Sequence, residues 1–168
     1  MEKITFKNSP LTLVGEESKI GDKAPEFSVV DKSLKEVKLK DFAGKIKVFT
    51  IFPSIDTPVC DMQVRGFNKR ASALSGDIVV IGVSKDLPFA LSRFCAAAGI
   101  DRVVTLSDYQ NSSFGENYGL LIKELNLLAR AVLIVDKEDK IVYRQVVTEV
   151  TNQPNYEEVF NKLTEVVG

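Results

Sequence analysis

Residues 46–60, IKVFTIFPSIDTPVC, hold the segment that decides the fold. The first seven are mostly apolar and either β-branched or aromatic, which is typical of a central, buried strand. Pro53 ends that strand, because proline cannot donate a hydrogen bond to a neighbouring strand. Thr57 and Pro58 then predict the start of a helix, since threonine is a favoured N-cap residue and proline is favoured at the first helical position.

Further elements are expected on both sides of this unit. Asp86, with Pro88 two residues later, predicts the start of another helix, which Gly99 would end. Two alternating runs around residues 8–10 predict an N-terminal β-hairpin. We expect strands at 4–6, 11–14, 27–30, 36–40, 46–52, 77–83, 103–106, 130–135 and 140–147, and helices at 57–74, 88–98, 112–118 and 156–167. This order describes a mixed central sheet flanked by helices, and the topology that we expect is a thioredoxin-like three-layer α/β sandwich.

The composition is that of an ordinary globular protein. With 168 residues, the chain can form a sizeable core, and we expect one domain over residues 1–168. Lys and Arg number 22 and Asp and Glu 23, so the charge balance favours neither nucleic acid nor an anionic membrane as partner. No apolar stretch approaches the roughly 20 residues that span a bilayer, and the N-terminus lacks the apolar run of a signal peptide. We therefore expect a cytoplasmic protein.

The chain contains no histidine and only two cysteines. The absence of histidine removes Cys-His and Ser-His-Asp mechanisms as they are usually built. Two cysteines without histidine also argue against a zinc site, and we expect neither a metal nor another cofactor. In the cytoplasm, two cysteines are expected to be reduced or transiently bonded rather than permanently cross-linked.

Cys60 is the first candidate for chemistry. If Thr57 is the N-cap residue, Cys60 is the third residue of the helix, where free backbone N–H groups and the helix dipole favour an anion. The thiolate is such an anion and is also the reactive form of cysteine. Thr57 would be close enough to hydrogen-bond the sulfur or an oxygen of a bound substrate. The alternative interpretation is a small buried residue that only fills space, as most free cysteines do.

At these residues the sequence resembles a known family. Pro53, Thr57 and Cys60 reproduce the Pro-x-x-x-Thr-x-x-Cys signature of the peroxiredoxins, and PSIDTPVC at 53–60 is similar to their thiol peroxidase branch. DLPFALSRFC at 86–95 and LLARAVLIVD at 127–136 are similar to the same branch, as is the N-terminal hairpin. The resemblance covers essentially the whole chain.

The resemblance implies a role for each matching residue. Cys60 matches the peroxidatic cysteine, which attacks hydroperoxides and becomes a sulfenic acid. Thr57 matches the residue that hydrogen-bonds peroxide and thiolate, Pro53 the proline that shields the sulfur, and Arg130 the arginine that stabilises the thiolate and polarises the peroxide. Cys95 matches the resolving cysteine of the atypical 2-Cys type, which forms a disulfide within one subunit. The resemblance also implies thioredoxin as reductant and a homodimer; hydrogen peroxide and organic hydroperoxides are the expected substrates.

Taken without the resemblance, Arg130 and Cys95 each have a second interpretation. Arg130 begins an apolar strand, where an arginine can simply extend to solvent. Cys95 shares a helical stripe with Leu91 and Phe94, which is typical of a structural cysteine. The 34 residues between the cysteines do not fix the distance between them, and a bond would need Cα atoms within about 7 Å.

Three other classes of protein are alternatives to a peroxidase. A disulfide oxidoreductase needs a Cys-x-x-Cys pair at the start of the helix, and position 57 is threonine. A redox sensor could use the same cysteines but would turn over slowly or once. A nucleotide-binding α/β protein is disfavoured because no strand is followed by a Gly-x-Gly-x-x-Gly or Walker motif.

Overall fold

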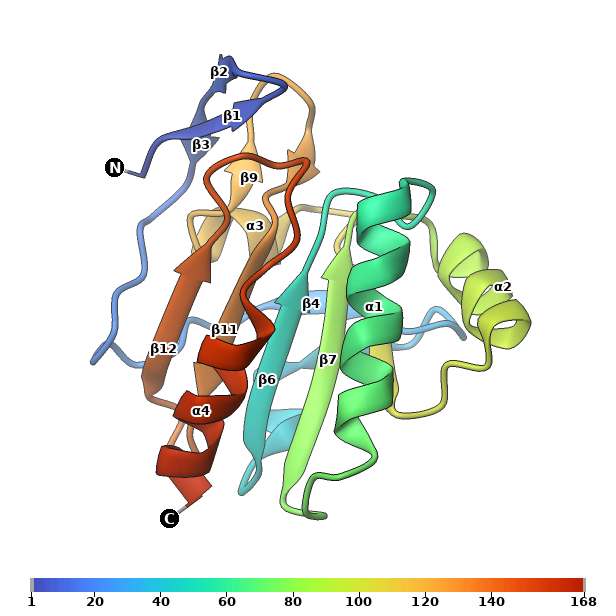
Figure 1. Ribbon diagram of the computed structural model, residues 1–168, viewed down its shortest axis with the longest axis vertical. Helices are drawn as coiled ribbons and strands as arrows, with labels where there is room; N and C mark the ends of the chain where they lie inside the picture. Colours follow the sequence, from blue (N-terminus) through green and yellow to red (C-terminus); the bar gives the residue numbers. More distant parts are fainter. Residues whose placement is uncertain (1, 168) are drawn as a thin grey trace.

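A seven-stranded mixed sheet lies at the centre of the computed structural model, which describes residues 2–167 (Figure 1). Its strands lie in the order β12 (Ile141–Val146), β11 (Ala131–Val135), β6 (Ile46–Ile51), β7 (Ile78–Ser84), β8 (Val103–Ser107), β4 (Ser28–Val30) and β5 (Glu36–Lys38). Strands β6, β7 and β8 are parallel to one another, whereas β11 and β4 are antiparallel to both of their neighbours. The predicted mixed sheet is confirmed.

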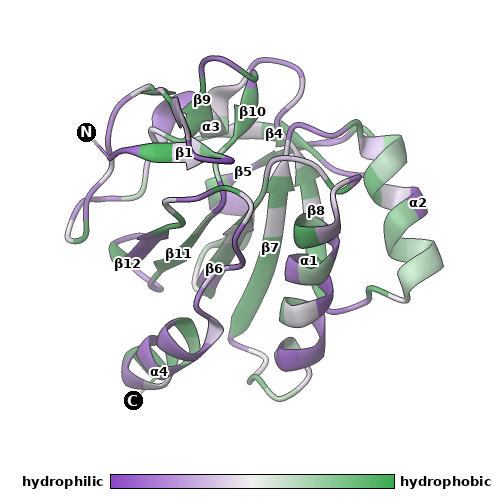
Figure 2. Ribbon diagram, turned by 45° about the horizontal axis from the view of Figure 1, so that its top comes forward, coloured by the Kyte–Doolittle hydropathy of each residue, from purple (hydrophilic) through white to green (hydrophobic). Residues whose placement is uncertain are grey.

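Helices cover both faces of this sheet. Helices α1 (Pro58–Ala71) and α4 (Tyr156–Val167) lie on the face turned to the viewer in Figure 1, and α3 (Ser113–Asn117) lies on the opposite face. Helix α2 (Pro88–Ala98) packs beside α1 and contacts β8. Figure 2 shows apolar and polar residues alternating around α4, as expected for a helix with one buried side. None of the helices within residues 2–167 is both long and apolar enough to cross a membrane.

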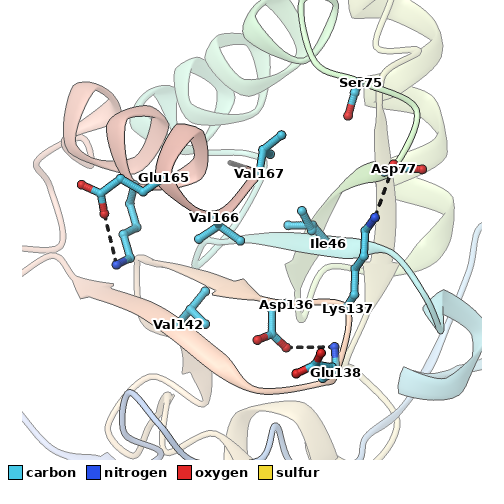
Figure 3. A pocket seen from close by; sticks show the side chains of 11 residues that line it. Ile46, Ser75, Asp77, Asp136, Lys137, Glu138, Val142, Glu165, Val166 and Val167 are labelled. Atoms are coloured by element: carbon cyan, nitrogen blue, oxygen red, sulfur yellow. Dashed lines mark hydrogen bonds and ion pairs between the residues drawn. The ribbon is translucent and has the colours of Figure 1, made fainter.

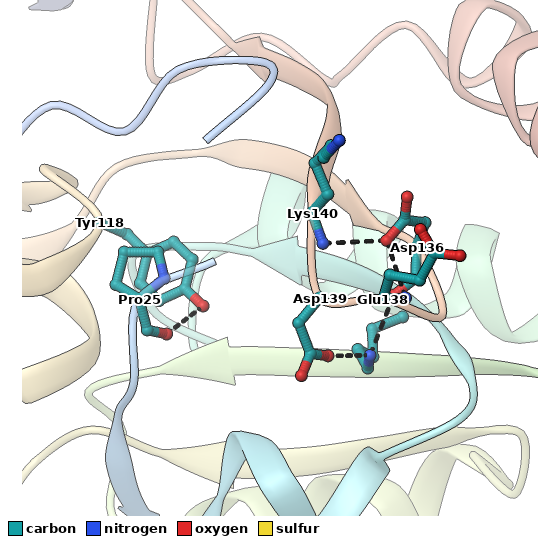
Figure 4. Close-up of polar contacts among 7 residues, drawn as sticks. Pro25, Tyr118, Asp136, Glu138, Asp139 and Lys140 are labelled. Atoms are coloured by element: carbon teal, nitrogen blue, oxygen red, sulfur yellow. Dashed lines mark hydrogen bonds and ion pairs between the residues drawn. The ribbon is translucent and has the colours of Figure 1, made fainter. Parts of the chain in front are cut away.

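The side chains of β6 alternate between the two faces of the sheet. Val48 packs in the cluster under α1 and α4, whereas Phe49 and Ile51 pack in the cluster on the α3 side. Lys47 is also fully buried, and its ammonium group donates to Asp139 Oδ1 at 2.5 Å and to a backbone carbonyl at 3.1 Å (Figure 4). These two acceptors satisfy the buried charge at the end of β6 where the strand begins.

The N-terminal hairpin is present, but its turn lies earlier than predicted. Strand β1 (Ile4–Phe6) pairs with β2 (Ser9–Leu11), and the turn residues Lys7 and Asn8 have φ values of 49° and 68°. Such a two-residue turn matches the twist of the paired strands. The placement of the turn at residues 8–10, with 11–14 as one strand, is therefore wrong.

A second small sheet was missed by the sequence analysis. Strand β3 (Leu13–Val14) pairs with β9 (Leu121–Ile122), which in turn pairs with β10 (Leu127–Leu128). Each of these strands has two residues, which is too short for an alternating pattern to show.

Most of the remaining predicted boundaries are close to those observed. Helix α4 has the predicted limits, and α2 ends at Gly99, whose φ of 66° is the left-handed conformation expected there. Helix α1 ends at Ala71 rather than at residue 74, and the chain continues in tighter turns, in which the Ala73 and Leu74 N–H groups donate to carbonyls three residues earlier. The strand expected over 36–40 ends two residues early and continues as a 3-10 helix, η1 (Leu39–Phe42).

Candidate active site

Cys60 lies in the first turn of α1, at the end of β6 that is uppermost in Figure 1. Thr57 is the N-cap residue, so Cys60 occupies the third helical position, as predicted. The cysteine is 0% exposed. It packs in a cluster with apolar side chains of the loop between β6 and α1, of α1 and of α2: Phe52, Ile55, Val64 and Leu91. These side chains close the sulfur off from solvent in this structure.

Arg130 provides the charge that faces this cysteine. Its Nη1 atom donates to the Cys60 sulfur at 3.3 Å and to Gln63 Oε1 at 2.8 Å, while its Nε donates to the Val150 carbonyl at 2.8 Å. Arg130 is 2% exposed, so its charge acts in a site from which water is largely excluded. The head group therefore does not extend to solvent, which was the alternative interpretation.

The register of the sheet brings Arg130 to this place. Ala131 pairs with Ile51, the last residue of β6, so the residue before β11 lies beside the loop that leads to Cys60. Seventy residues separate Cys60 and Arg130 along the chain, and only the antiparallel pairing of β6 with β11 makes them neighbours. Local sequence patterns indicate both residues, and only the family resemblance implied that Arg130 acts on the Cys60 thiolate.

Gln63 is a site residue that the sequence analysis missed. It is fully buried, accepts from Arg130, and donates through Nε2 to Thr50 Oγ1 at 2.7 Å and to the Ile51 carbonyl at 3.1 Å. A polar residue one helical turn after Cys60, on the same side of α1 as Val64, was the available signal.

Thr57 and Pro53 belong to the loop between β6 and α1. The Thr57 hydroxyl donates to the Ser54 carbonyl at 3.0 Å and makes no capping bond to the helix. Thr57 is exposed, whereas Pro53 is buried directly after β6. The predicted hydrogen bond of Thr57 to the sulfur or to an oxygen of a bound substrate stays a prediction.

Asp86 was interpreted as the cap of α2, and this assignment is wrong. The N-cap residue is Leu87, and no side chain caps the helix. The Asp86 carboxylate instead accepts from the Ser54 hydroxyl at 3.0 Å and from the Ile55 N–H at 2.8 Å. The Ser84 hydroxyl is its third donor, at 2.7 Å. Asp86 therefore joins the start of α2 to the loop that precedes Cys60.

Cys95 occupies a different environment on α2. Both cysteines are free in this structure, and the Cys95 sulfur lies 3.8 Å from Thr105 Oγ1. Burial raises the pKa of the Cys95 thiol, while the contact with Thr105 and the charge of Lys32 lower it. The thiol is only half-buried and lines an open pocket between α2, β8 and the loop after β4, to whose lining Lys32 also belongs.

Comparisons with known proteins agree with this geometry. The Redoxin family model matches residues 19–160. The thiol peroxidase of Bacillus subtilis (strain 168) is 54% identical over 157 residues, covering 94% of this chain and 93% of the relative. A thiol peroxidase of Oceanobacillus iheyensis is 50% identical over 163 residues, covering 97% of this chain and 99% of the relative.

The chain belongs to the thiol peroxidases of the Redoxin family. A solved peroxiredoxin-like protein from Aquifex aeolicus is 42% identical and superposes with a TM-score of 0.92, covering 99% of this chain and 98% of the other. Thiol peroxidase from Chromobacterium violaceum, at 19% identity, has the same fold with a TM-score of 0.87, covering 98% of this chain and 96% of the other. The protein is thus a peroxidase, an oxidoreductase that reduces peroxides with thiols, on a thioredoxin-like fold.

A further pocket of this thiol peroxidase lies at the opposite end of β6, around Ile46 (Figure 3). Its cationic groups are paired: Lys137 with Asp77 at 3.4 Å and Lys162 with Glu165 at 3.3 Å. Within residues 2–167, no three His, Cys, Asp or Glu side chains are grouped closely enough to hold a metal ion. The side chains around this pocket offer no reactive group comparable to the Cys60 thiol.

Proposed function

We propose that Cys60 is the peroxidatic thiol and that Arg130 is the cation that serves it. The observation that carries this proposal is the 3.3 Å contact between Arg130 Nη1 and the Cys60 sulfur at the start of α1. A guanidinium group keeps its proton at neutral pH, and it presents several donors in a fixed plane. It can therefore stabilise the thiolate and also donate to a peroxide oxygen without a further rearrangement.

In the first step, the Cys60 thiolate attacks the terminal oxygen of a hydroperoxide in line with the O–O bond. An S–O bond forms and the O–O bond breaks, so that the sulfur is oxidised to a sulfenic acid and the leaving oxygen departs as water or an alcohol after taking up a proton. Negative charge grows on that oxygen in the transition state. Donors fixed before the reaction, Arg130 above all, stabilise this charge without having to reorganise. Thr57 and Pro53 would orient the peroxide and exclude water.

In the second step, the Cys95 thiol attacks the Cys60 sulfenic acid within the same subunit. An S–S bond forms and the hydroxyl group leaves as water with the thiol proton. The support for this step is that Cys95 lies on the helix that packs against the Cys60 cluster through Leu91. The first turn of α1 must unwind for the sulfurs to meet. A resolving thiol also protects Cys60 from irreversible oxidation.

The cycle closes when thioredoxin reduces the Cys60–Cys95 disulfide by thiol–disulfide exchange, with its own dithiol becoming a disulfide. We propose the cytoplasm as the compartment, since both cysteines are free and thioredoxin keeps thiols reduced there. Hydrogen peroxide and organic hydroperoxides are the proposed substrates. The apolar side chains of Phe52 and Ile55 beside the sulfur favour the organic ones.

We also propose that the protein forms a homodimer. Leu87 and Phe89, at the start of α2, are 52% and 63% exposed, and burial against a second copy would remove this apolar surface from water. Sedimentation equilibrium of the reduced protein tests the assembly. A monomer at micromolar concentration would contradict it.

The decisive experiment couples peroxide consumption to thioredoxin, thioredoxin reductase and NADPH. We expect continuous turnover with hydrogen peroxide and with an organic hydroperoxide. One equivalent of peroxide should yield a monomeric chain on a non-reducing denaturing gel, with a Cys60–Cys95 bond in the peptide map. Disulfide-linked dimers on that gel would place the resolving step between subunits, and consumption of a single equivalent would indicate a sensor.

A further inference from the structure

The peptide group between Val150 and Thr151 connects Arg130 to the carboxylate of Glu149. Its carbonyl oxygen accepts from Arg130 Nε at 2.8 Å, and its N–H donates to Glu149 Oε2 at 2.9 Å. The guanidinium group that faces Cys60 is therefore one peptide away from Glu149. Val150 is 3% exposed, so this peptide lies largely out of solvent.

Glu149 in turn is held by the N-terminal hairpin. Its Oε1 accepts from the Thr5 hydroxyl at 2.8 Å and from the Asn8 N–H at 2.9 Å. The backbone of Thr5 also pairs with this segment, donating to the Thr148 carbonyl at 2.7 Å and accepting from the Val150 N–H at 2.9 Å. In Figure 1, β1 lies beside the segment that joins β12 to α4. The hairpin and the support of Arg130 are thus one hydrogen-bonded unit.

The charge of Glu149 is well suited to this place. The Asn8 N–H, followed by the hydroxyl and N–H of Thr151, holds the pKa of the Glu149 carboxyl well below its usual range. The group is therefore ionised at neutral pH. A carboxylate that accepts from a peptide N–H polarises that peptide and makes its carbonyl oxygen a stronger acceptor. The acceptor strengthened here is the one that holds Arg130 Nε.

We propose that Glu149 is a positioning residue for Arg130, acting through the Val150–Thr151 peptide and braced by the N-terminal hairpin. The inference rests on the proposed role of Arg130 at Cys60. Two groups outside the cysteine fix the guanidinium: Gln63 accepts from Nη1, and the Val150 carbonyl accepts from Nε. When the second contact weakens, the guanidinium can rotate away from the line to the sulfur. The hairpin, far from Cys60 in the sequence, thereby contributes to the rate of peroxide reduction.

Glu149→Gln is the test, because the side chain keeps its length and loses one of its two acceptor oxygens. Glu124→Gln is its matched control. Glu124 also binds the N-terminal segment with both oxygens, accepting from the Thr12 N–H at 2.8 Å and the Thr12 hydroxyl at 2.7 Å. Its contacts with that segment lead to Thr12 and not to Arg130. Thr5→Val is a milder second variant, which removes one donor to Glu149 and keeps the backbone pairing.

The reduced proteins are mixed with peroxide in single-turnover stopped-flow experiments from pH 4 to pH 9. Glu149→Gln removes the charge and one oxygen that accepts two hydrogen bonds, and we expect a rate about three- to tenfold below wild type at pH 7. The acid limb of its pH–rate profile should move to higher pH, because a less fixed guanidinium favours the thiolate less. Thr5→Val should shift in the same direction by a smaller factor, and Glu124→Gln should match wild type.

The direction of the shift separates positioning from simple electrostatics. Removing a negative charge near a thiol would by itself favour the thiolate and move the acid limb to lower pH. A wild-type rate in Glu149→Gln, a shift to lower pH, or an equal loss in Glu124→Gln would each overturn the inference. If Glu149→Gln does not fold, the same criteria apply to Thr5→Val. Arg130→Lys is measured alongside: a wild-type rate there would instead overturn the proposed function.

Discussion

The two cysteines of this protein lie in opposite kinds of environment. Cys60 is fully buried at a helix start and receives a hydrogen bond from Arg130, whose position is fixed by further buried groups. Cys95 is half-buried beside an open pocket, and its sulfur lies 3.8 Å from Thr105 Oγ1. The first site holds its hydrogen-bond donors in place before any reaction, whereas the second adjoins open space. On the proposed mechanism, the attacking thiol uses the fixed donors, and the resolving thiol uses the open space.

Two contacts join these environments. The Arg65 guanidinium lies over the Phe94 ring at 5.4 Å, linking α1 to the residue before Cys95. The Asp86 carboxylate links the start of α2 to Ser54 and Ile55, in the loop before Cys60. Both contacts tie the helix of the second cysteine to the surroundings of the first. They stabilise the form in which both thiols are free, and on the proposed mechanism they would loosen when the disulfide forms.

The largest effect is expected from Cys60→Ser. A hydroxyl group at this position is neither ionised at neutral pH nor comparably nucleophilic, so peroxidase activity should be abolished. The measurement is consumption of one equivalent of peroxide by the reduced protein followed by turnover with a thiol reductant; in the single-equivalent assay Cys95→Ser, which keeps Cys60 and Arg130, is the control for loss of a sulfur atom alone. Turnover above a few per cent of wild type would contradict the assignment of Cys60.

Cys95→Ser should separate the reaction of Cys60 with peroxide from the later step that depends on Cys95. Cys60 and Arg130 remain intact, so one equivalent of peroxide should still be reduced at the wild-type rate. Turnover with thioredoxin should fail or fall sharply, because no internal disulfide is presented to the reductant. Mass spectrometry after graded peroxide doses should find sulfinic and sulfonic acid at lower doses than in wild type. Normal turnover would show that the enzyme works with one cysteine.

Arg130→Lys should cost at least about tenfold in the rate of the first step, equivalent to roughly 1.4 kcal/mol of transition-state stabilisation. The charge is kept, but an ammonium group cannot donate to the sulfur, to Gln63 and to the Val150 carbonyl from one plane. Stopped-flow oxidation of the reduced protein measures this directly. A rate equal to wild type would make Arg130 a structural residue. The disulfide-forming step, which depends on Cys95, should change little.

The sequence predicted the parts of this site that local patterns determine. Thr57-Pro58 placed the helix start, which put Cys60 in its first turn, and Gly99 placed the end of α2. Local patterns could not predict contacts that depend on strand register, and the link of Arg130 to Cys60 was implied only by the family resemblance. Arg130 meets Cys60 because β6 and β11 are antiparallel neighbours, and no local pattern encodes that pairing.

Side chains that serve distant groups were the ones most easily missed. In the sequence, Gln63 could be explained as a polar residue of a helix, and Asp86 as the cap of the next helix. Only the folded structure shows that Gln63 holds Arg130 and that Asp86 holds the loop of Ser54. The short strands β9 and β10 were missed for a related reason, since pairing with β3 and with each other, rather than propensity, creates them.

The smallest effect is expected at Asp86, where the two environments meet. Asp86→Ala removes the acceptor of the Ile55 N–H and the Ser54 hydroxyl, so the loop before Cys60 becomes less ordered. Loss of such bonds predicts a first step about two- to fivefold slower. Disulfide formation should become faster by a similar factor, because the start of α2 is no longer tied to that loop. Asp86→Asn keeps an oxygen for the Ile55 N–H and should lie between alanine and wild type.

A slower first step together with faster disulfide formation distinguishes this linkage through Asp86 from general destabilisation of the fold. Destabilisation alone gives no reason for the two rates to change in opposite directions from Asp86→Asn to Asp86→Ala. The matched control is Asp136→Ala, which removes an aspartate that accepts from the N–H groups of Glu138 and Lys140 in the turn between β11 and β12. It should lower the midpoint of thermal unfolding and leave both steps at wild-type rates. Stopped-flow oxidation measures the first step, and acid-quenched gels measure the second. If Asp86→Ala slows both steps equally, Asp86 only stabilises the fold, and the two cysteine environments are independent of each other.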